Sequence, residues 1–96
     1  MGEHPTPTFE WDPRKAIANL RKHSLSFEEA LTAFADPLSM TIPDPDNAAG
    51  EERCLLVGTS VRGRLVVAAH VERGQNIRII SARRATRRER RDYEEG

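Results

Sequence analysis

The stretch RLVVAAHVERGQNIRIISARR, residues 64–84, decides the fold because two strand-like segments flank a short turn sequence. Both segments are rich in valine, isoleucine and alanine, and the glycine within RGQN, residues 73–76, suits a tight connection. We therefore predict an antiparallel hairpin with strands at 64–72 and 76–84.

The length of the hairpin loop determines which side chains face each other across the two strands. A two-residue loop pairs Val71 with Arg78, whereas a three-residue loop pairs Glu72 with Arg78 and His70 with Ile80. The sequence is compatible with either loop, so we predict the hairpin without choosing its register.

Arg78 and Arg83 are unusual because each lies in an otherwise apolar strand. Side chains alternate between the two faces of a strand, so we expect these arginines on opposite faces, with one of them facing away from the main helices. Burying a guanidinium costs free energy unless a carboxylate, such as Glu51, Glu52 or Glu72, or a phosphate neutralises it. A site that binds a phosphodiester is therefore one explanation for their position.

Outside the hairpin, the sequence predicts three more strands, two helices in the N-terminal half and one short helix at the C-terminus. Asp12 and Ser26 are helix-start signals, and Thr86 with Glu89 forms a capping box like that of Ser26 with Glu29. The predicted segments are strands at 9–11, 38–42 and 53–58, and helices at 13–22, 26–35 and 86–93. Consecutive strands without intervening helices favour an α+β fold, in which helices pack against a mostly antiparallel sheet.

Hydrophobic periodicity predicts which side of each N-terminal helix faces the core. In the second helix, the apolar residues repeat at i, i+3, i+4 and i+7. The residues expected to face inward are Ala16, Ile17 and Leu20 in the first helix, and Phe27, Ala30, Leu31 and Phe34 in the second.

The 96 residues have a formal net charge of zero, but the charges are unevenly distributed. Residues 1–50 carry four basic and eight acidic residues, a net charge of −4, whereas residues 51–96 carry eleven and seven, a net charge of +4. Between 78 and 91, seven arginines accompany a single acid, Glu89, and such a local positive field attracts polyanions. We expect residues 1–8 to be a flexible leader and residues 9–96 to be a single domain.

Several classes of function have no support in the sequence. No apolar run is long enough to cross a bilayer, and the N-terminus lacks the features of a signal peptide, so we expect a cytoplasmic protein. Cys54 lies among apolar neighbours, and we expect a buried, unreactive thiol. There is no phosphate-binding glycine loop, and His4, His23 and His70 are widely spaced, so we expect neither a nucleotide cofactor nor a metal.

The remaining titratable and basic side chains match the chemistry of metal-independent RNA cleavage. That reaction needs a base for the 2′-hydroxyl, an acid for the departing oxygen and cations for the charged transition state. Candidate proton carriers are His23, His70, Glu51, Glu52 and Tyr93, and candidate cations are Lys22, Arg64, Arg78, Arg83 and Arg84. A non-catalytic module that binds RNA or a protein through its arginine-rich face is the alternative, and DNA recognition by the short C-terminal helix is a weaker one.

Four segments together resemble a known family. They are FEWDPRKAIANLRKHSLSFEEALTAFADP at 9–37, EER at 51–53, GRLVVAAHVERG at 63–74 and IRIISARRATRRERRDYE at 77–94. In this order they resemble the BrnT toxins of bacterial type II toxin-antitoxin systems. The resemblance implies a RelE-like fold, ribonuclease activity that inhibits translation, and a BrnA-type antitoxin that binds DNA, represses the operon and holds the toxin in a higher-order complex.

The resemblance extends to single residues. Lys22 and His23 match the K-H at the end of the first helix, with Ser24 where the family often has glycine. In the wider RelE-like class, basic residues on the central strands and a C-terminal tyrosine often surround the scissile phosphate, as Arg64, Arg83 and Tyr93 would here. The predicted catalytic set is Arg64, His70, Arg78, Arg83, Tyr93 and Glu52, and the predicted RNA-binding set is Lys22, His23, Arg53, Arg84, Arg87 and Arg88.

Overall fold

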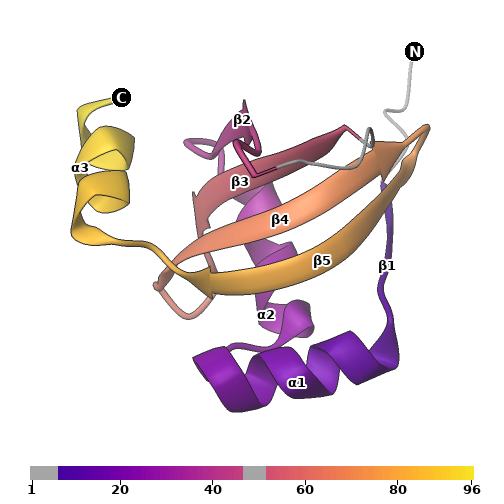
Figure 1. Ribbon diagram of the computed structural model, residues 1–96. Helices are drawn as coiled ribbons and strands as arrows, with labels where there is room; N and C mark the ends of the chain where they lie inside the picture. The colour runs from indigo at the N-terminus through magenta and orange to yellow at the C-terminus, as the bar shows by residue number, and fades with distance from the viewer. Residues whose placement is uncertain (1–6, 47–51) are drawn as a thin grey trace.

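Five strands form one sheet in the computed structural model, which describes residues 7–46 and 52–96 (Figure 1). The strands are β1 (Thr8–Glu10), β2 (Met40–Pro43), β3 (Arg53–Thr59), β4 (Leu65–Arg73) and β5 (Asn76–Arg84). The helices are α1 (Pro13–His23), α2 (Phe27–Thr32) and α3 (Arg87–Glu95), and the 3-10 turn η1 (Ala33–Ala35) directly follows α2.

The strand order in the sheet is β1-β5-β4-β3-β2. Only β1 and β5 are parallel, and the other three neighbouring pairs are antiparallel. The prediction of an α+β fold with a mostly antiparallel sheet, two N-terminal helices and a short C-terminal helix is confirmed. Most of the predicted leader lies outside the described residues, and Thr8 already belongs to β1. None of the described helices is long and apolar enough to span a membrane.

The β4–β5 hairpin has the shorter of the two possible loops. Arg73 pairs with Asn76, and Val71 pairs with Arg78, so only two residues connect the strands. Gly74, in this loop, has a φ of 61°, which glycine adopts without strain. The structure therefore selects the register that the sequence left open.

A β-bulge corrects the expectation that Arg78 and Arg83 lie on opposite faces of the sheet. Ile79 and Ala82 both belong to the core beneath the helices, although three positions separate them. The ladder is irregular between them, and Ile80 is the additional residue on β5. The bulge shifts the alternation by one residue, so Arg78 and Arg83 both face away from α1 and α2.

The main core lies between the sheet and the two N-terminal helices. Phe27 and Ala30 of α2 are fully buried there, as predicted, and Leu31 and Phe34 pack against the same cluster while remaining partly exposed. Trp11 packs edge-on against Phe27, with their ring centroids 5.8 Å apart. The apolar face of α2 therefore supplies most of the helical side of the core.

The predicted inward face of α1 is wrong for Ile17 and Leu20, which are 56% and 52% exposed. Asn19 faces inward instead and is 7% exposed. Its amide donates to the carbonyl oxygens of Leu25 and Ala82 at 3.0 and 2.8 Å, and its oxygen accepts from the N–H of Ala82 at 3.0 Å. Because β1 pairs with β5 only at 76–78, the outer backbone groups of Ala82 need another partner, and Asn19 provides it.

The two predicted capping boxes differ in the structure. At α3, both halves form, since the Thr86 side chain accepts from the Glu89 N–H and the Glu89 carboxylate accepts from the Thr86 N–H. At α2, Ser26 accepts from the Glu29 N–H at 3.0 Å, but the Glu29 carboxylate binds Ser60 and Arg64 instead. A tertiary ion pair has replaced half of the second box.

Ser24 ends α1 in the left-handed conformation, with a φ of 54°. This conformation is unfavourable for any residue with a Cβ atom, and glycine adopts it freely. We expect Ser24→Gly to raise the free energy of unfolding by about 0.5–1 kcal/mol, measured by urea denaturation. The matched control is Ser81→Gly, in an extended strand, which should lower the free energy of unfolding. A loss of stability in both variants would contradict the explanation that the left-handed conformation of Ser24 is unfavourable.

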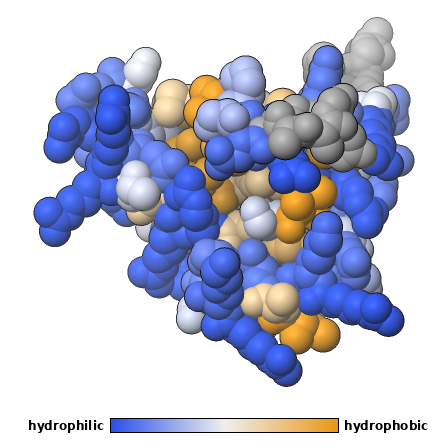
Figure 2. All heavy atoms as spheres, in the orientation of Figure 1, coloured by the Kyte–Doolittle hydropathy of each residue, from blue (hydrophilic) through white to orange (hydrophobic). Residues whose placement is uncertain are grey.

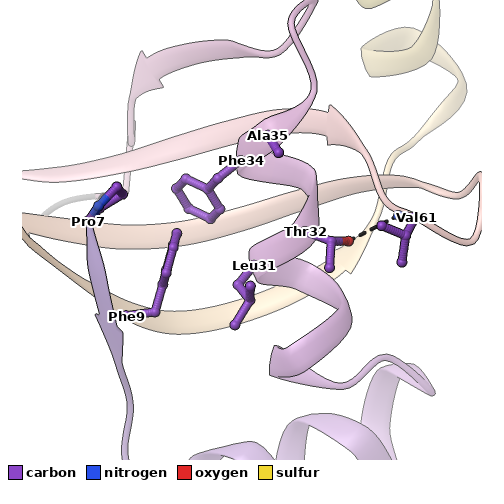
Figure 3. Close-up of a pocket in the computed structure, with 7 residues that line it drawn as sticks. All are labelled: Pro7, Phe9, Leu31, Thr32, Phe34, Ala35 and Val61. Atoms are coloured by element: carbon purple, nitrogen blue, oxygen red, sulfur yellow. Dashed lines mark hydrogen bonds between the residues drawn. The ribbon is translucent and has the colours of Figure 1, made fainter. Parts of the chain in front are cut away.

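An apolar hollow of about 420 Å³ lies between β1 and the α2–η1 segment (Figure 3). Phe9 and Phe34 point toward one another at one side of it, with ring centroids 5.0 Å apart. On the other side, the Thr32 hydroxyl accepts from the Val61 N–H at 3.0 Å. The remaining lining residues are Pro7, Leu31 and Ala35. This hollow has no charged lining residue, so it offers nothing that would bind a phosphate.

Candidate functional site

The sheet face opposite α1 and α2 brings basic side chains around an apolar centre. In Figure 1 this face is turned to the viewer, with α2 behind the sheet and α3 beyond its left end. Figure 2 shows hydrophobic atoms in the middle of the same side with hydrophilic side chains around them. Cross-strand pairing sets three rows on this face: Arg53 with Val71 and Arg78, Leu55 with Ala69 and Ser81, and Val57 with Val67 and Arg83.

A hollow of about 420 Å³ lies over the central row, and we call it the arginine hollow. Arg53 and Arg83 belong to the rows on either side of an apolar floor formed by Leu55 and Ala69. Its other lining residues are Ile42, Asp44, Pro45, Asp46, Ser81 and Glu89. The two guanidinium groups suit a ligand that carries both a flat apolar part and a phosphate, and such a phosphate must compete with the carboxylates of Asp44, Asp46 and Glu89 in the same lining.

Arg53 has hydrogen-bonding capacity that the described residues do not use. Its Nε is buried and has no partner within residues 7–46 and 52–96. A buried N–H without an acceptor costs free energy, about 1–3 kcal/mol in typical cases. An anion in the arginine hollow is one partner that would remove this cost.

Arg83 is bound to Glu89 of α3 by two hydrogen bonds. The guanidinium donates to the two carboxylate oxygens at 2.7 and 2.9 Å, and the side chains are 39% and 27% exposed. These bonds lower the pKa of Glu89 to about 2 and raise that of Arg83 further. A phosphate that binds Arg83 must therefore compete with a carboxylate already in place.

We expect the Arg83–Glu89 ion pair to make the free energy of unfolding depend on pH in the acidic range. The pKa of Glu89 falls from 4.5 to about 2 on folding, so its contribution is complete above pH 4.5 and is lost as the pH falls toward 2. Glu89→Gln should therefore destabilise the protein at pH 6 and differ less from the parent at pH 3, measured by urea denaturation. Glu94→Gln, on the exposed side of α3, is the control and should have little effect at either pH.

Tyr93 lies near Arg83 but uses its hydroxyl for a structural bond. It donates to Asp36 at 2.6 Å and lies 3.2 Å from the Thr59 hydroxyl. The bond to Asp36 raises the pKa of Tyr93 and lowers that of Asp36. The ring packs against the cluster of Val57, Leu65 and Val67, so Tyr93 and Glu89, four residues apart, both hold α3 on the sheet.

Arg64 forms an ion pair with Glu29 and does not line the arginine hollow. Its guanidinium donates to both carboxylate oxygens of Glu29 on α2, and Ser60 donates to the same carboxylate at 2.7 Å. Glu29 is 7% exposed, and the hydrogen bonds from Arg64 lower its pKa. This ion pair joins the start of β4 to α2, and Arg64 does not line the arginine hollow.

His70 lies on the core side of β4 and is fully buried. Phe34 packs edge-on against its ring, with centroids 4.9 Å apart. Glu52 is exposed and lines a separate hollow with Cys54. Neither His70 nor Glu52 lines the arginine hollow, so the structure does not bring these two predicted proton carriers to Arg83.

Lys22 and His23 lie at the end of α1, beside the outer edge of β5. They line a hollow of about 210 Å³ together with Ile80 and Ser81 at the outer edge of β5. Ser81 also lines the arginine hollow, so the two hollows adjoin at this residue. The structure therefore brings Lys22 and His23 close to the strand that carries Arg83.

The other predicted arginines are spread around this region. Arg78 is 34% exposed and forms an ion pair with Glu10 of β1 at 3.0 Å. Arg84 is exposed at the end of β5, and Arg87 and Arg88 are exposed in the first turn of α3. None of these four lines the arginine hollow.

Sequence reasoning missed the carboxylates that hold the functional side chains. Glu10, Glu29, Asp36 and Glu89 bind Arg78, Arg64, Tyr93 and Arg83 respectively. Glu89 carried a signal as the one acid among seven arginines, whereas the capping boxes of Glu29 and Glu89 predict only bonds to the backbone. The other three lie far along the chain from their partners, where local patterns cannot reveal a contact.

Comparison with known proteins finds a matching family and a matching fold. A family model described as "Ribonuclease toxin, BrnT, of type II toxin-antitoxin system" matches residues 11–89. Among solved structures, the ribonuclease toxin BrnT of Brucella abortus has a TM-score of 0.60 and 23% sequence identity, covering 85% of this chain and all of that one. No curated protein matches the sequence. At this identity the structural match shows a shared fold.

Proposed function

Since the chain belongs to the BrnT family of ribonuclease toxins from type II toxin-antitoxin systems, we propose that it is a metal-independent endoribonuclease that inhibits translation by cleaving RNA. The observation that carries the proposal is the arginine hollow, where Arg53 and Arg83 face each other across an apolar floor. A base rests on the floor, and the guanidinium groups bind the adjoining phosphate oxygens.

In this proposal, Arg83 is the principal phosphate ligand. RNA displaces the Glu89 carboxylate from its guanidinium, and the charge that develops on the phosphate in the transition state is stabilised there. Arg53 supplies the second cation through its Nε–H, which has no partner among residues 7–46 and 52–96, and Lys22 adds a positive charge at the neighbouring hollow that shares Ser81. Arg84, Arg87 and Arg88 attract RNA from the rim.

His23 is the proton carrier that the geometry favours. It is partly exposed and lines the hollow that shares Ser81 with the arginine hollow, whereas His70 is fully buried in the core. The 2′-oxygen attacks phosphorus while His23 takes its proton, the bond from phosphorus to the 5′-oxygen breaks, and that oxygen is reprotonated from solvent. The products are a 2′,3′-cyclic phosphate and a 5′-hydroxyl. Arg64, Arg78, Glu52 and Tyr93 act outside this step, in folding or in positioning.

The proposed partner is an antitoxin of the BrnA type that binds DNA and occupies the arginine hollow in a higher-order complex. The exposed apolar residues beside it, such as Ile42 at 46% exposure, suit a protein partner better than RNA alone. The alternative function, a non-catalytic module that binds RNA or protein, uses the same surface without His23.

RNA incubated with the purified protein in EDTA tests the proposed activity. We expect fragments ending in a 2′,3′-cyclic phosphate, and growth arrest on expression that the cognate antitoxin relieves. The alternative module would retain the RNA without producing fragments, with an affinity that falls steeply with salt. Intact RNA at high protein concentration would contradict the proposed enzyme.

A further inference from the structure

Three potential metal ligands gather on the core side of β3 and β4. The Sγ of Cys54, a ring nitrogen of His70 and a carboxylate oxygen of Glu72 all lie within 4.8 Å of one another. Cys54 and His70 are cross-strand partners, and Glu72 follows His70 by two residues on the same face. The pairing of the strands therefore assembles this set, although the three residues are dispersed in the sequence.

The hydrogen bond on one side of His70 determines what the other nitrogen offers. Nδ1 lies 3.1 Å from the carbonyl oxygen of Ala68, and a carbonyl only accepts, so Nδ1 carries a hydrogen. In the neutral ring, Nε2 then presents a lone pair, and it lies 3.3 Å from a carboxylate oxygen of Glu72. Histidines that bind metals commonly donate their second N–H to a backbone carbonyl in this way. The edge contact with Phe34 holds the ring in this orientation.

The charges around Cys54 favour a cation. Burial and the carboxylates of Glu72, Glu52 and Asp44 raise the pKa of the thiol, because each of them disfavours a thiolate. A divalent cation between the thiol and Glu72 would oppose this rise in the pKa of Cys54, since it stabilises the thiolate and neutralises the Glu72 carboxylate.

A route from solvent reaches the cysteine. A hollow of about 320 Å³ is lined by Cys54, Asp44 and Glu52, together with Pro43 and Arg53. An ion can therefore approach Cys54 from this hollow, the exposed side chain of Glu72 can turn toward it, and water from the hollow can complete its coordination.

We propose that Cys54, His70 and Glu72 bind a zinc ion, with water from the adjacent hollow as the fourth ligand. Zinc bonds of about 2.0–2.3 Å place tetrahedral ligand atoms roughly 3.4–3.8 Å apart, so the set needs only a small contraction. The Glu72 side chain is 56% exposed and can turn to make it. The ion connects β3 to β4 from the sheet face opposite Arg83, and the two hollows share Asp44 and Arg53. Zinc binding is measured without RNA, so its test does not depend on the proposed ribonuclease activity.

Cobalt substitution of the full chain tests this site. The reduced, EDTA-stripped protein is titrated with Co²⁺, and we expect one equivalent to produce a thiolate-to-cobalt charge-transfer band and the strong visible bands of a tetrahedral site. Zn²⁺ should displace the cobalt and raise the unfolding temperature in proportion to its free concentration.

Ligand variants make the assignment specific. Cys54→Ser should abolish the charge-transfer band, and Glu72→Gln should weaken Zn²⁺ binding at least about 10-fold. His23→Asn and Glu28→Gln, which change an unrelated histidine and an unrelated carboxylate, should bind as the parent does. Absence of the bands in the folded parent, or bands that survive Cys54→Ser, would overturn the proposal and leave His70 and Glu72 as an ion pair.

Discussion

Arg83→Ala reduces the rate of RNA cleavage by about 100- to 1,000-fold, the usual loss when one preorganised donor to a transition-state oxyanion is removed. Arg83 combines the properties that make a large effect expected. It lines the arginine hollow, its planar guanidinium can bind two phosphate oxygens at once, and its charge persists at any working pH. The measurement is the single-turnover cleavage rate of a defined RNA in EDTA.

Two further variants separate a direct role of Arg83 from support of α3. Glu89→Gln breaks the same ion pair and loosens α3 but leaves the cation in the hollow, so it should retain most of the activity. Arg91→Ala removes an exposed charge from α3 and should reduce the rate only slightly. Equal losses in Arg83→Ala and Glu89→Gln would show that Arg83 acts by holding α3.

Asn19→Ala lowers the free energy of unfolding by about 3 kcal/mol, because it leaves several buried backbone groups without partners at once. The N–H and carbonyl of Ala82 and the carbonyl of Leu25 all bond to the Asn19 amide. Each unsatisfied buried group costs about 1–3 kcal/mol, and partial access of water reduces the sum. Urea denaturation measures the change.

Leu20→Ala is the informative control for this prediction. Periodicity alone expects Leu20 in the core, where truncation costs about 2–5 kcal/mol. The structure leaves it 52% exposed, so we expect a change within about 0.5 kcal/mol. A large loss in Leu20→Ala with a small one in Asn19→Ala would mean that α1 is rotated relative to the structure described.

The β4–β5 hairpin separates what local patterns can predict from what they cannot. Its second strand begins and ends at the predicted residues, Asn76 and Arg84, because β-branched residues and turn signals act over a few positions. The bulge at Ile80 leaves no comparable signal. It brings Arg78 and Arg83 to one face, which strict alternation forbids.

The candidate site shows the same division. Arginine enrichment and family resemblance, both visible in the sequence, pointed to this strand and to Lys22 and His23, which lie beside it in the structure. By residue type alone, Arg64 and His70 were as good candidates for the site as Lys22 and His23. Their environments differ because Arg64 forms an ion pair with Glu29, whereas His70 packs against Phe34. Both partners lie far from these residues in the sequence.

The sequence by itself determined the elements, their order, the α+β class and the concentration of arginine in the last third of the chain, because propensities, caps and turns are properties of neighbouring residues. The tertiary structure decided which cations remain accessible. Carboxylates on other elements bind Arg64, Arg78 and Arg83, and sheet pairing leaves Arg83 in the lining of the hollow that Arg53 also lines. The physical reason is that the desolvation of each charge depends on partners brought together only by folding.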